Sequence, residues 1–215
     1  GNMRETILVG VDNSSDRLRE YTPPGCTPPF GGSSLGAAYT EFLVAELKPV
    51  IDATYRTLPD PDHTGVMGSS MGGLISTYLG WQRSDVFRRI GAMSSSYQVC
   101  LPVPFPDNKR PIRIYLDSGD TADGLAGTMV ARDTLVRNGY VLFDDLDHTI
   151  GYGHNHNEYW WDRRSPRAFT FLFPTSDEAN RVLDTHACPP QITGFTGTNL
   201  TWTAYRSRRY TVQGV

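Results

Sequence analysis

The sequence lacks the features that would direct the protein to nucleic acid or into a membrane. Its 20 Lys and Arg residues are outnumbered by 23 Asp and Glu residues, giving a net charge of -3, and they form no run. A nucleic-acid-binding surface needs clustered positive charge, and a membrane helix needs about 20 consecutive apolar residues. The sequence has neither, so we expect no nucleic-acid partner and no membrane partner.

Cysteine is also scarce. Cys26, Cys100 and Cys188 are the three cysteines, and none belongs to a C-x-x-C pair of the kind found in zinc or redox sites. An odd count in a chain of this size does not define a disulfide framework, although it allows one bridge. The cysteines therefore do not identify the cellular compartment of the protein, and secretion and a periplasmic location are among the alternatives.

Apolar runs alternate with helical patterns over residues 1–174, which we expect to form one domain. Strands are predicted at 6–11, 64–67, 89–93, 112–116 and 140–143. The first of these is almost continuously apolar, as in a parallel strand covered on both faces. Helices are predicted from 39 to 51 with a kink or break at Pro49, after Ser70, from about 124 to 137, and around 169–173. This alternation predicts a doubly wound, mostly parallel α/β sheet.

The composition changes after about Pro174. Residues 175–190 are predicted to form a linker. Residues 191–215 are rich in Thr, Gly and aromatic residues, and alternating runs at 200–203 and 210–212 predict antiparallel strands. We expect this part to be the start of a small β-rich module.

Residues 66–73 contain the most informative motif. Gly68, Ser70 and Gly72 form G-x-S-x-G between a strand-like and a helix-like run. This is the pattern of a nucleophile elbow, in which glycines relieve the crowding of a sharp strand-to-helix turn and expose the serine hydroxyl. The N–H of Met71 can then donate to an oxyanion. The alternative is a structural serine in a Gly-rich turn.

A serine hydroxyl becomes a strong nucleophile only when a histidine removes its proton and a carboxylate orients that histidine. In α/β-hydrolases these groups follow in the order serine, acid, histidine, on loops after sheet strands. The chain offers Asp120 and Asp123 after the strand at 112–116, and then His154 and His156.

Three stretches carry a family resemblance. They are residues 7–23, 42–95 and 117–174, the last including His156-Asn157-Glu158, Trp161-Asp162-Arg163-Arg164 and Phe171-Leu172-Phe173-Pro174. They resemble the bacterial putative-esterase family, which groups with feruloyl and acetyl-xylan esterases, esterase D and the mycolyltransferases. The resemblance implies an α/β-hydrolase fold and carboxylic ester hydrolysis without a cofactor or metal.

Carried over residue by residue, the resemblance implies Ser70 as nucleophile, His156 as base and an acid on the loop holding Asp120 and Asp123. Asp123 is preferred because it directly precedes the helix expected near Gly124. Family members carry further strands before residues 6–11, and a loop that supplies a second oxyanion donor. We therefore expect a preceding segment of the same protein, before Gly1, to complete the fold. Because the segment after Gln191 stops after only a few strands' worth of residues, we also expect the native polypeptide to extend beyond Val215.

Two alternatives concern the histidines. His154, His156 and Glu158 alternate, so on a strand they would point the same way and could bind a metal, but the Gly- and Asn-rich context indicates a loop. His154 is also an alternative base.

The resemblance favours acetyl or hydroxycinnamoyl esters of a polysaccharide as substrates. Tyr159, Trp160 and Trp161 could wall a pocket for a sugar or an aromatic acyl group, although core packing explains at least one of them equally well. The competing hypothesis is a binding module for carbohydrate or a partner that keeps a hydrolase fold without catalysis.

Overall fold

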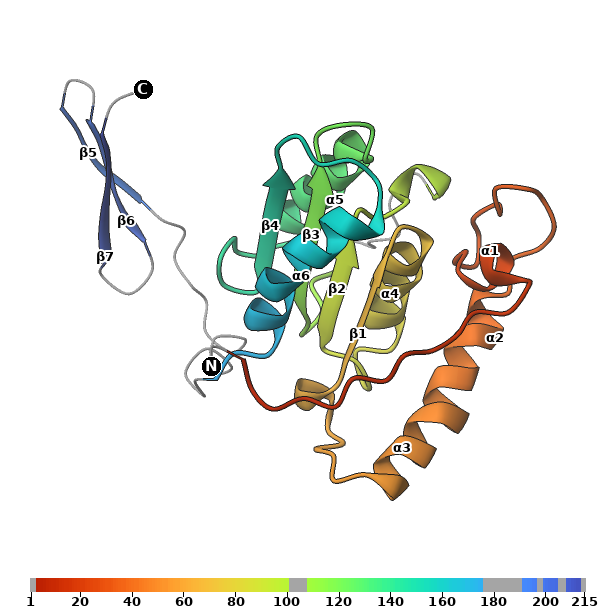
Figure 1. The fold of residues 1–215 in the computed structure, drawn as a ribbon. Helices are drawn as coiled ribbons and strands as arrows, with labels where there is room; N and C mark the ends of the chain where they lie inside the picture. Colours follow the sequence, from red (N-terminus) through yellow and green to blue (C-terminus); the bar gives the residue numbers. More distant parts are fainter. Residues whose placement is uncertain (1–2, 101–107, 176–190, 197–198, 205–207, 214–215) are drawn as a thin grey trace. The chain divides into compact units, whose positions relative to one another are not determined.

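The computed structural model describes residues 3–100, 108–175, 191–196, 199–204 and 208–213. The chain divides into two units, Gly1–Leu183 and Asp184–Val215. In the first unit, parallel strands form a four-stranded sheet in the order β1-β2-β3-β4 (Figure 1). The strands are β1 (Gly65–Ser69), β2 (Arg89–Met93), β3 (Arg113–Gly119) and β4 (Leu146–Gly151).

The register brings the carboxyl ends of these strands to one edge of the sheet. Ser69 pairs with Met93, Met93 with Asp117, and Gly119 with Gly151. Every residue of β2 and β3 is buried, including the polar residues Arg89, Arg113, Asp117 and Ser118. The apolar stretches 90–93 and 114–116 fit strands that are covered on both faces. Loops that leave this edge therefore lie close together.

Helices cover both faces of the sheet. Side chains of α4 (Met71–Gln82) and α5 (Leu125–Arg137) form one core with alternate residues of the strands, including Leu74, Leu79, Leu135, Ile90, Ile114 and Leu116. A second core joins α6 (Glu158–Leu172) to the opposite face through Met93, Tyr115, Ala168 and Leu172. The prediction of a doubly wound α/β fold is confirmed.

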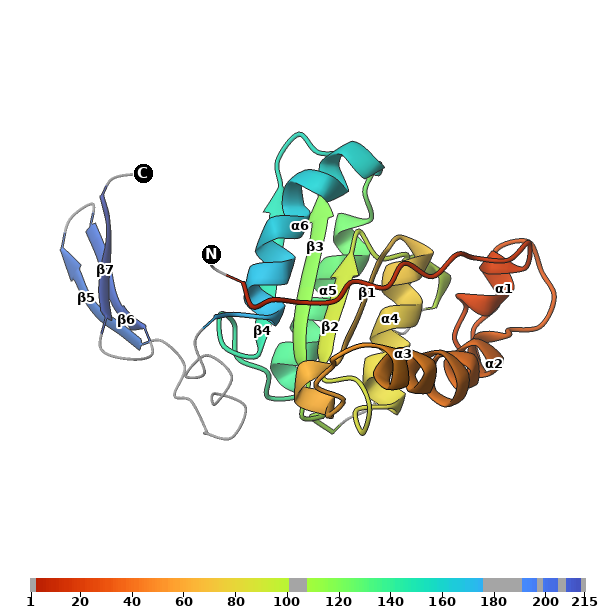
Figure 2. The same ribbon diagram turned by 60° about the horizontal axis from the view of Figure 1, so that its bottom comes forward.

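The predicted strand at 6–11 is wrong. The segment has no strand pairing, and Ile7, Leu8 and Val9 are 47%, 66% and 43% exposed. Figure 2 shows it as a plain trace between the N-terminus and α1 (Arg17–Glu20). An apolar run becomes a strand only when a neighbouring backbone completes its hydrogen bonds, and no described strand pairs with this segment.

The predicted strand at 140–143 is displaced. Tyr140 is buried, but the chain then turns: Asp144 N–H donates to the Val141 carbonyl, and the Val141 N–H donates to the Asp145 carboxylate at 2.7 Å. Leu142 forms only an isolated bridge with Leu146, where β4 begins. Side-chain hydrogen bonding by aspartate favours such turns over strands.

The predicted helix at 39–51 changes type instead of breaking. It consists of α2 (Gly36–Glu41), a π-helical stretch η1 (Phe42–Leu47) and α3 (Lys48–Thr54), with Pro49 in the first turn of α3. Proline lacks an N–H, so a local change in hydrogen-bond register before it avoids a lost bond. Two short 3₁₀ turns, η2 (Pro61–His63) and η3 (Tyr97–Val99), complete the unit.

A disulfide joins Cys26 to Cys100, so one bridge forms where the sequence allowed one. In the second unit, β5 (Gln191–Thr196), β6 (Asn199–Ala204) and β7 (Arg208–Gln213) form an antiparallel sheet, as predicted for 200–203 and 210–212. Within the described part of the chain, none of the helices has the length and apolar character needed to cross a membrane.

Candidate active site

Ser70 occupies the sharp turn between β1 and α4. Its backbone has φ 58° and ψ -125°, a strained conformation for a residue other than glycine. Its N–H donates to the Met93 carbonyl at 2.9 Å, which helps to hold this geometry. A Cβ on Gly68 would lie 2.6 Å from the Gly72 carbonyl carbon, whereas a Cβ on Gly72 would meet nothing within 4 Å. Crowding in the turn therefore requires glycine at 68.

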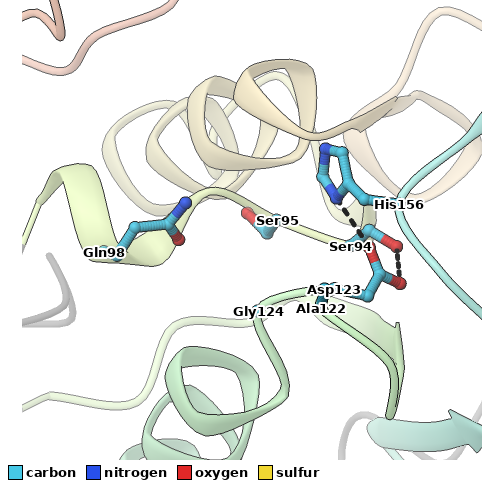
Figure 3. A pocket seen from close by; sticks show the side chains of 7 residues that line it. All are labelled: Ser94, Ser95, Gln98, Ala122, Asp123, Gly124 and His156. Carbon is cyan, nitrogen blue, oxygen red and sulfur yellow. Dashed lines mark hydrogen bonds and ion pairs between the residues drawn. The ribbon is translucent and has the colours of Figure 1, made fainter.

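His156 connects Ser70 to Asp123. Its Nε2 lies 2.9 Å from the Ser70 Oγ, and its Nδ1 lies 2.6 Å from Oδ1 of Asp123 (Figure 3 shows the second contact). Ser70 follows β1, Asp123 lies between β3 and α5, and His156 lies between β4 and α6. The parallel register thus brings together three groups that are far apart in the sequence.

Burial differs sharply along this chain of hydrogen bonds. The Asp123 side chain is fully buried, whereas the His156 side chain is 37% exposed. A buried carboxylate needs hydrogen bonds and a positive partner, while a base that transfers protons must face the substrate. The site therefore places Asp123 in a buried environment and His156 in a partly exposed one.

A second group of contacts holds the other oxygen of Asp123. Oδ2 accepts hydrogen bonds from the Ser94 hydroxyl at 2.6 Å, from the Gly119 N–H, and from Nη2 of Arg164 at 3.3 Å. The indole N–H of Trp161 donates to the Ser94 Oγ at 2.9 Å. The ring of Trp161 also stands edge-on to His156, with centroids 5.1 Å apart.

The alternative residues lie elsewhere. Asp120 is exposed, and its Oδ1 accepts hydrogen bonds from the Gly153 N–H at 2.8 Å and the Thr121 hydroxyl at 3.0 Å. His154 stacks on Trp160 with a centroid separation of 3.8 Å, and its Nδ1 lies 3.2 Å from Nη1 of Arg164.

The alternating acidic and histidine residues at 154–158 lie in a loop and the first residue of α6, not on a strand. No group of three or more His, Cys, Asp or Glu side chains suited to a metal occurs in the part of the chain that the structure describes.

Three serines, Ser94 to Ser96, follow β2, and two of them contact the site. Ser94 has a positive φ of 42° and hydrogen-bonds to Asp123, and the Ser96 Oγ lies 3.3 Å from the Ser70 Oγ. They follow the carboxyl end of a strand, where α/β proteins bind ligands, and this position was the sequence signal that could have identified them. Met71 is the first residue of α4, so its N–H is at the helix N-terminus, where backbone donors lack intrahelical partners.

A small cavity of about 260 Å³ adjoins His156. It is lined by Ser94, Ser95, Gln98, Ala122, Asp123, Gly124 and His156 (Figure 3). None of the three aromatic residues singled out in the sequence lines it. Trp161 supports Ser94 and His156, Trp160 packs on His154, and Tyr159 is 57% exposed.

The fold is that of an α/β-hydrolase. Residues 1–169 match the model of the family described as "Putative esterase", and the chain belongs to that family. A relative from Bacillus subtilis (strain 168), the uncharacterised protein YbbA, is 32% identical over 99 residues, which are 43% of this chain and 38% of that protein.

Solved structures share the fold at low sequence identity. A ferulic acid esterase matches with a TM-score of 0.53 and 20% identity over 63% of this chain and 60% of its own. The enterochelin esterase of Shigella flexneri matches with a TM-score of 0.56 and 17% identity over 74% and 40%. The BES protein of Bacillus cereus matches with a TM-score of 0.56 and 17% identity over 77% and 66%. The chain thus spans 38% of YbbA and 60% of the ferulic acid esterase.

Proposed function

We propose that this chain carries the catalytic site of a serine esterase, with Ser70 as nucleophile, His156 as general base and Asp123 as the acid that orients it. The observation that carries the proposal is the hydrogen-bonded series from Ser70 Oγ to His156 Nε2 and from His156 Nδ1 to Asp123 Oδ1, at 2.9 and 2.6 Å. Membership of the esterase family supports the same reaction class.

In the proposed reaction, His156 Nε2 takes the proton of Ser70 as Oγ attacks the ester carbonyl carbon. The carbonyl oxygen becomes an oxyanion, to which the Met71 N–H donates. The intermediate collapses, the alcohol leaves with the proton from His156, and an acyl-Ser70 ester remains. Water then gives a proton to His156 and attacks the acyl carbon, which releases the carboxylic acid and restores Ser70.

The test is turnover of p-nitrophenyl acetate by the whole protein and by its Ser70→Ala variant. We expect loss of turnover on the order of 10⁶-fold, because the nucleophile is removed. Ser165→Ala, a serine on α6 outside the site, is the matched control and should keep wild-type turnover. A fluorophosphonate should label Ser70 and not Ser69. An inactive whole protein without labelling would favour the binding-module hypothesis.

We further propose an acetyl or hydroxycinnamoyl ester of a carbohydrate as substrate. The family resemblance supports this class, as does the small cavity beside His156, whose lining includes Ser94, Ser95 and Gln98. Ferulic acid esterases share the fold, although fold alone does not define specificity.

Rates on methyl ferulate, acetylated xylan, enterobactin and a long-chain p-nitrophenyl ester would test the substrate class. The proposal requires one of the first two to be preferred. Preference for the long-chain ester or for enterobactin would overturn the substrate class and leave the serine mechanism intact.

A further inference from the structure

Arg164 lies directly behind the proposed acid. It belongs to α6, and its side chain is only 4% exposed. Its Nη2 donates to the Ser94 Oγ at 2.6 Å and to Oδ2 of Asp123 at 3.3 Å. Its Nε lies 3.1 Å from Oδ2 of Asp117. Its Nη1 lies 3.2 Å from Nδ1 of His154. The planar guanidinium therefore holds four polar groups in one fixed geometry.

The two oxygens of Asp123 have different partners, and Arg164 shares Oδ2 with the Ser94 hydroxyl and the Gly119 N–H. Oδ2 faces Arg164 and Ser94, which leaves Oδ1 directed at Nδ1 of His156. A carboxylate held on one oxygen cannot rotate freely about its terminal bond. This geometry fixes the position of Oδ1 of Asp123 against Nδ1 of His156.

Charge supports the same conclusion. The side chains of Asp117 and Asp123 are both fully buried. Within the described residues, Arg164 is the one Lys or Arg that forms an ion pair with either of them. Burial raises the pKa of Asp117, and the positive charge of Arg164 and the hydroxyl of Tyr115 oppose that effect. Without the guanidinium, Asp117 and Asp123 would be two buried carboxylates with no permanently charged cation beside them.

We propose that Arg164 is a positioning residue that orients Asp123 toward His156 and stabilises its negative charge. This inference rests on the proposed roles of Asp123 and His156. Arg164 itself touches no reacting atom. It acts by stabilising the negative charge on Asp123, which in turn stabilises the imidazolium that forms on His156.

The pH profile distinguishes positioning from a purely structural role. The titratable groups around the guanidinium are Asp117 and Tyr115 of β3, Asp123, and His154 and His156 of the loop before α6. Removing the positive charge makes it easier for the Asp123–His156 pair to bind a proton. The active form lacks that proton, so the acidic limb of kcat/KM must move to higher pH.

The experiment is the kcat/KM pH profile of the whole protein and of its Arg164→Met and Arg164→Lys variants. We expect the acidic limb of Arg164→Met to move up by about one pH unit, as for loss of a cation beside a carboxylate. Arg164→Lys should keep the limb close to wild type, because the charge remains, but lower kcat because one ammonium cannot reproduce the fork.

Two further variants keep the test decisive. Arg167→Met is the matched control on α6, because Arg167 pairs with the buried Asp147 at 2.7 Å outside the contacts described for the triad. The acidic limb of the Arg167→Met profile should stay at the wild-type pH. If Arg164→Met does not fold, Arg164→Met combined with Asp117→Asn removes one buried charge of each sign, and the limb shift is measured relative to Asp117→Asn alone, because the charge of Asp117 acts in the opposite direction. A fall in kcat at every pH with an unmoved limb would overturn the proposal.

A measurement without substrate separates this inference from the proposed function. NMR titration of the His156 ring should show a higher pKa in Arg164→Met than in the wild type, whether or not an ester is turned over. An inactive wild-type protein with that shift would refute the esterase and keep the positioning role. An active enzyme whose His156 titration is the same in both proteins would refute the positioning role alone.

Discussion

Two aspartates follow β3, and their surroundings differ in kind. Asp123 is enclosed by Ser94, Gly119 and His156, and its side chain is fully buried. Asp120 is exposed and hydrogen-bonds to the backbone of Gly153. A carboxylate that stabilises an imidazolium is most effective where water is excluded, which favours Asp123 on physical grounds.

Kinetics on the two asparagine variants should separate these residues. Asp123→Asn keeps the shape but removes the charge that stabilises protonated His156, so kcat on p-nitrophenyl acetate should fall on the order of 10⁴-fold. Asp120→Asn should change kcat only slightly, because its contact is with a surface turn. Thermal melts of both variants serve as controls for folding. A collapse of kcat in Asp120→Asn alone would contradict the assignment.

The strand β4 carries a histidine on the sheet itself. His148 pairs in register with Leu116 of β3, and burial lowers its pKa to about 4. The charge of Arg132 acts in the same direction, while Asp147 and Asp133 oppose it. A histidine in this environment is neutral in the folded protein and takes up a proton readily only after unfolding.

His148 should therefore make stability depend on pH. The unfolded chain protonates His148 below about pH 6.5, whereas the folded protein does so only below about pH 4. The free energy of unfolding therefore has its full value above pH 6.5 and falls as the pH drops toward 4. The loss is at most about 3 kcal/mol. Urea unfolding of wild type and His148→Gln between pH 7.5 and 4 would measure it. Equal pH dependence in the two proteins would rule out this contribution.

At the scale of the whole first unit, the disulfide Cys26–Cys100 joins distant parts of the chain. The two residues are separated by 74 positions. Cys26 lies in the Pro- and Gly-rich segment after α1, and Cys100 directly follows η3, close to Gln98 of the cavity lining. Closing so long a loop removes much of the conformational freedom of the unfolded chain.

Removing this bridge should destabilise the protein by about 4 kcal/mol, on the chain-entropy relation for a loop of this length. Urea unfolding of wild type and of the Cys26→Ala, Cys100→Ala double variant would provide the value. The bridge lies outside the hydrogen bonds of Ser70 and His156, so turnover of p-nitrophenyl acetate should persist where the variant is folded. Equal unfolding free energies would show that the bridge contributes no stability.

Local sequence determined the main elements of the fold. The buried strands β2 and β3 contain the apolar stretches 90–93 and 114–116, as expected where both faces of a sheet are covered, and they were predicted to within a few residues. The turn at Ser70 was predicted because its steric demand falls on neighbouring residues, Gly68 above all. Patterns of this kind depend on a residue and its immediate neighbours in the chain.

Tertiary structure alone decided the features that depend on distant partners. Residues 6–11 have the same apolar character as the true strands, yet no described strand pairs with them. The sequence preferred Asp123 and kept Asp120 as its rival, and only the tertiary structure shows that Asp123 is buried against Ser94 and contacts His156, whereas Asp120 is exposed. Arg164 belongs to a motif that carries the family resemblance, but no role was assigned to it from the sequence, since its contacts with Asp117 and Asp123 form only when α6 packs against the sheet. These features depend on burial and on contacts between residues far apart in the sequence, which a local sequence pattern does not report.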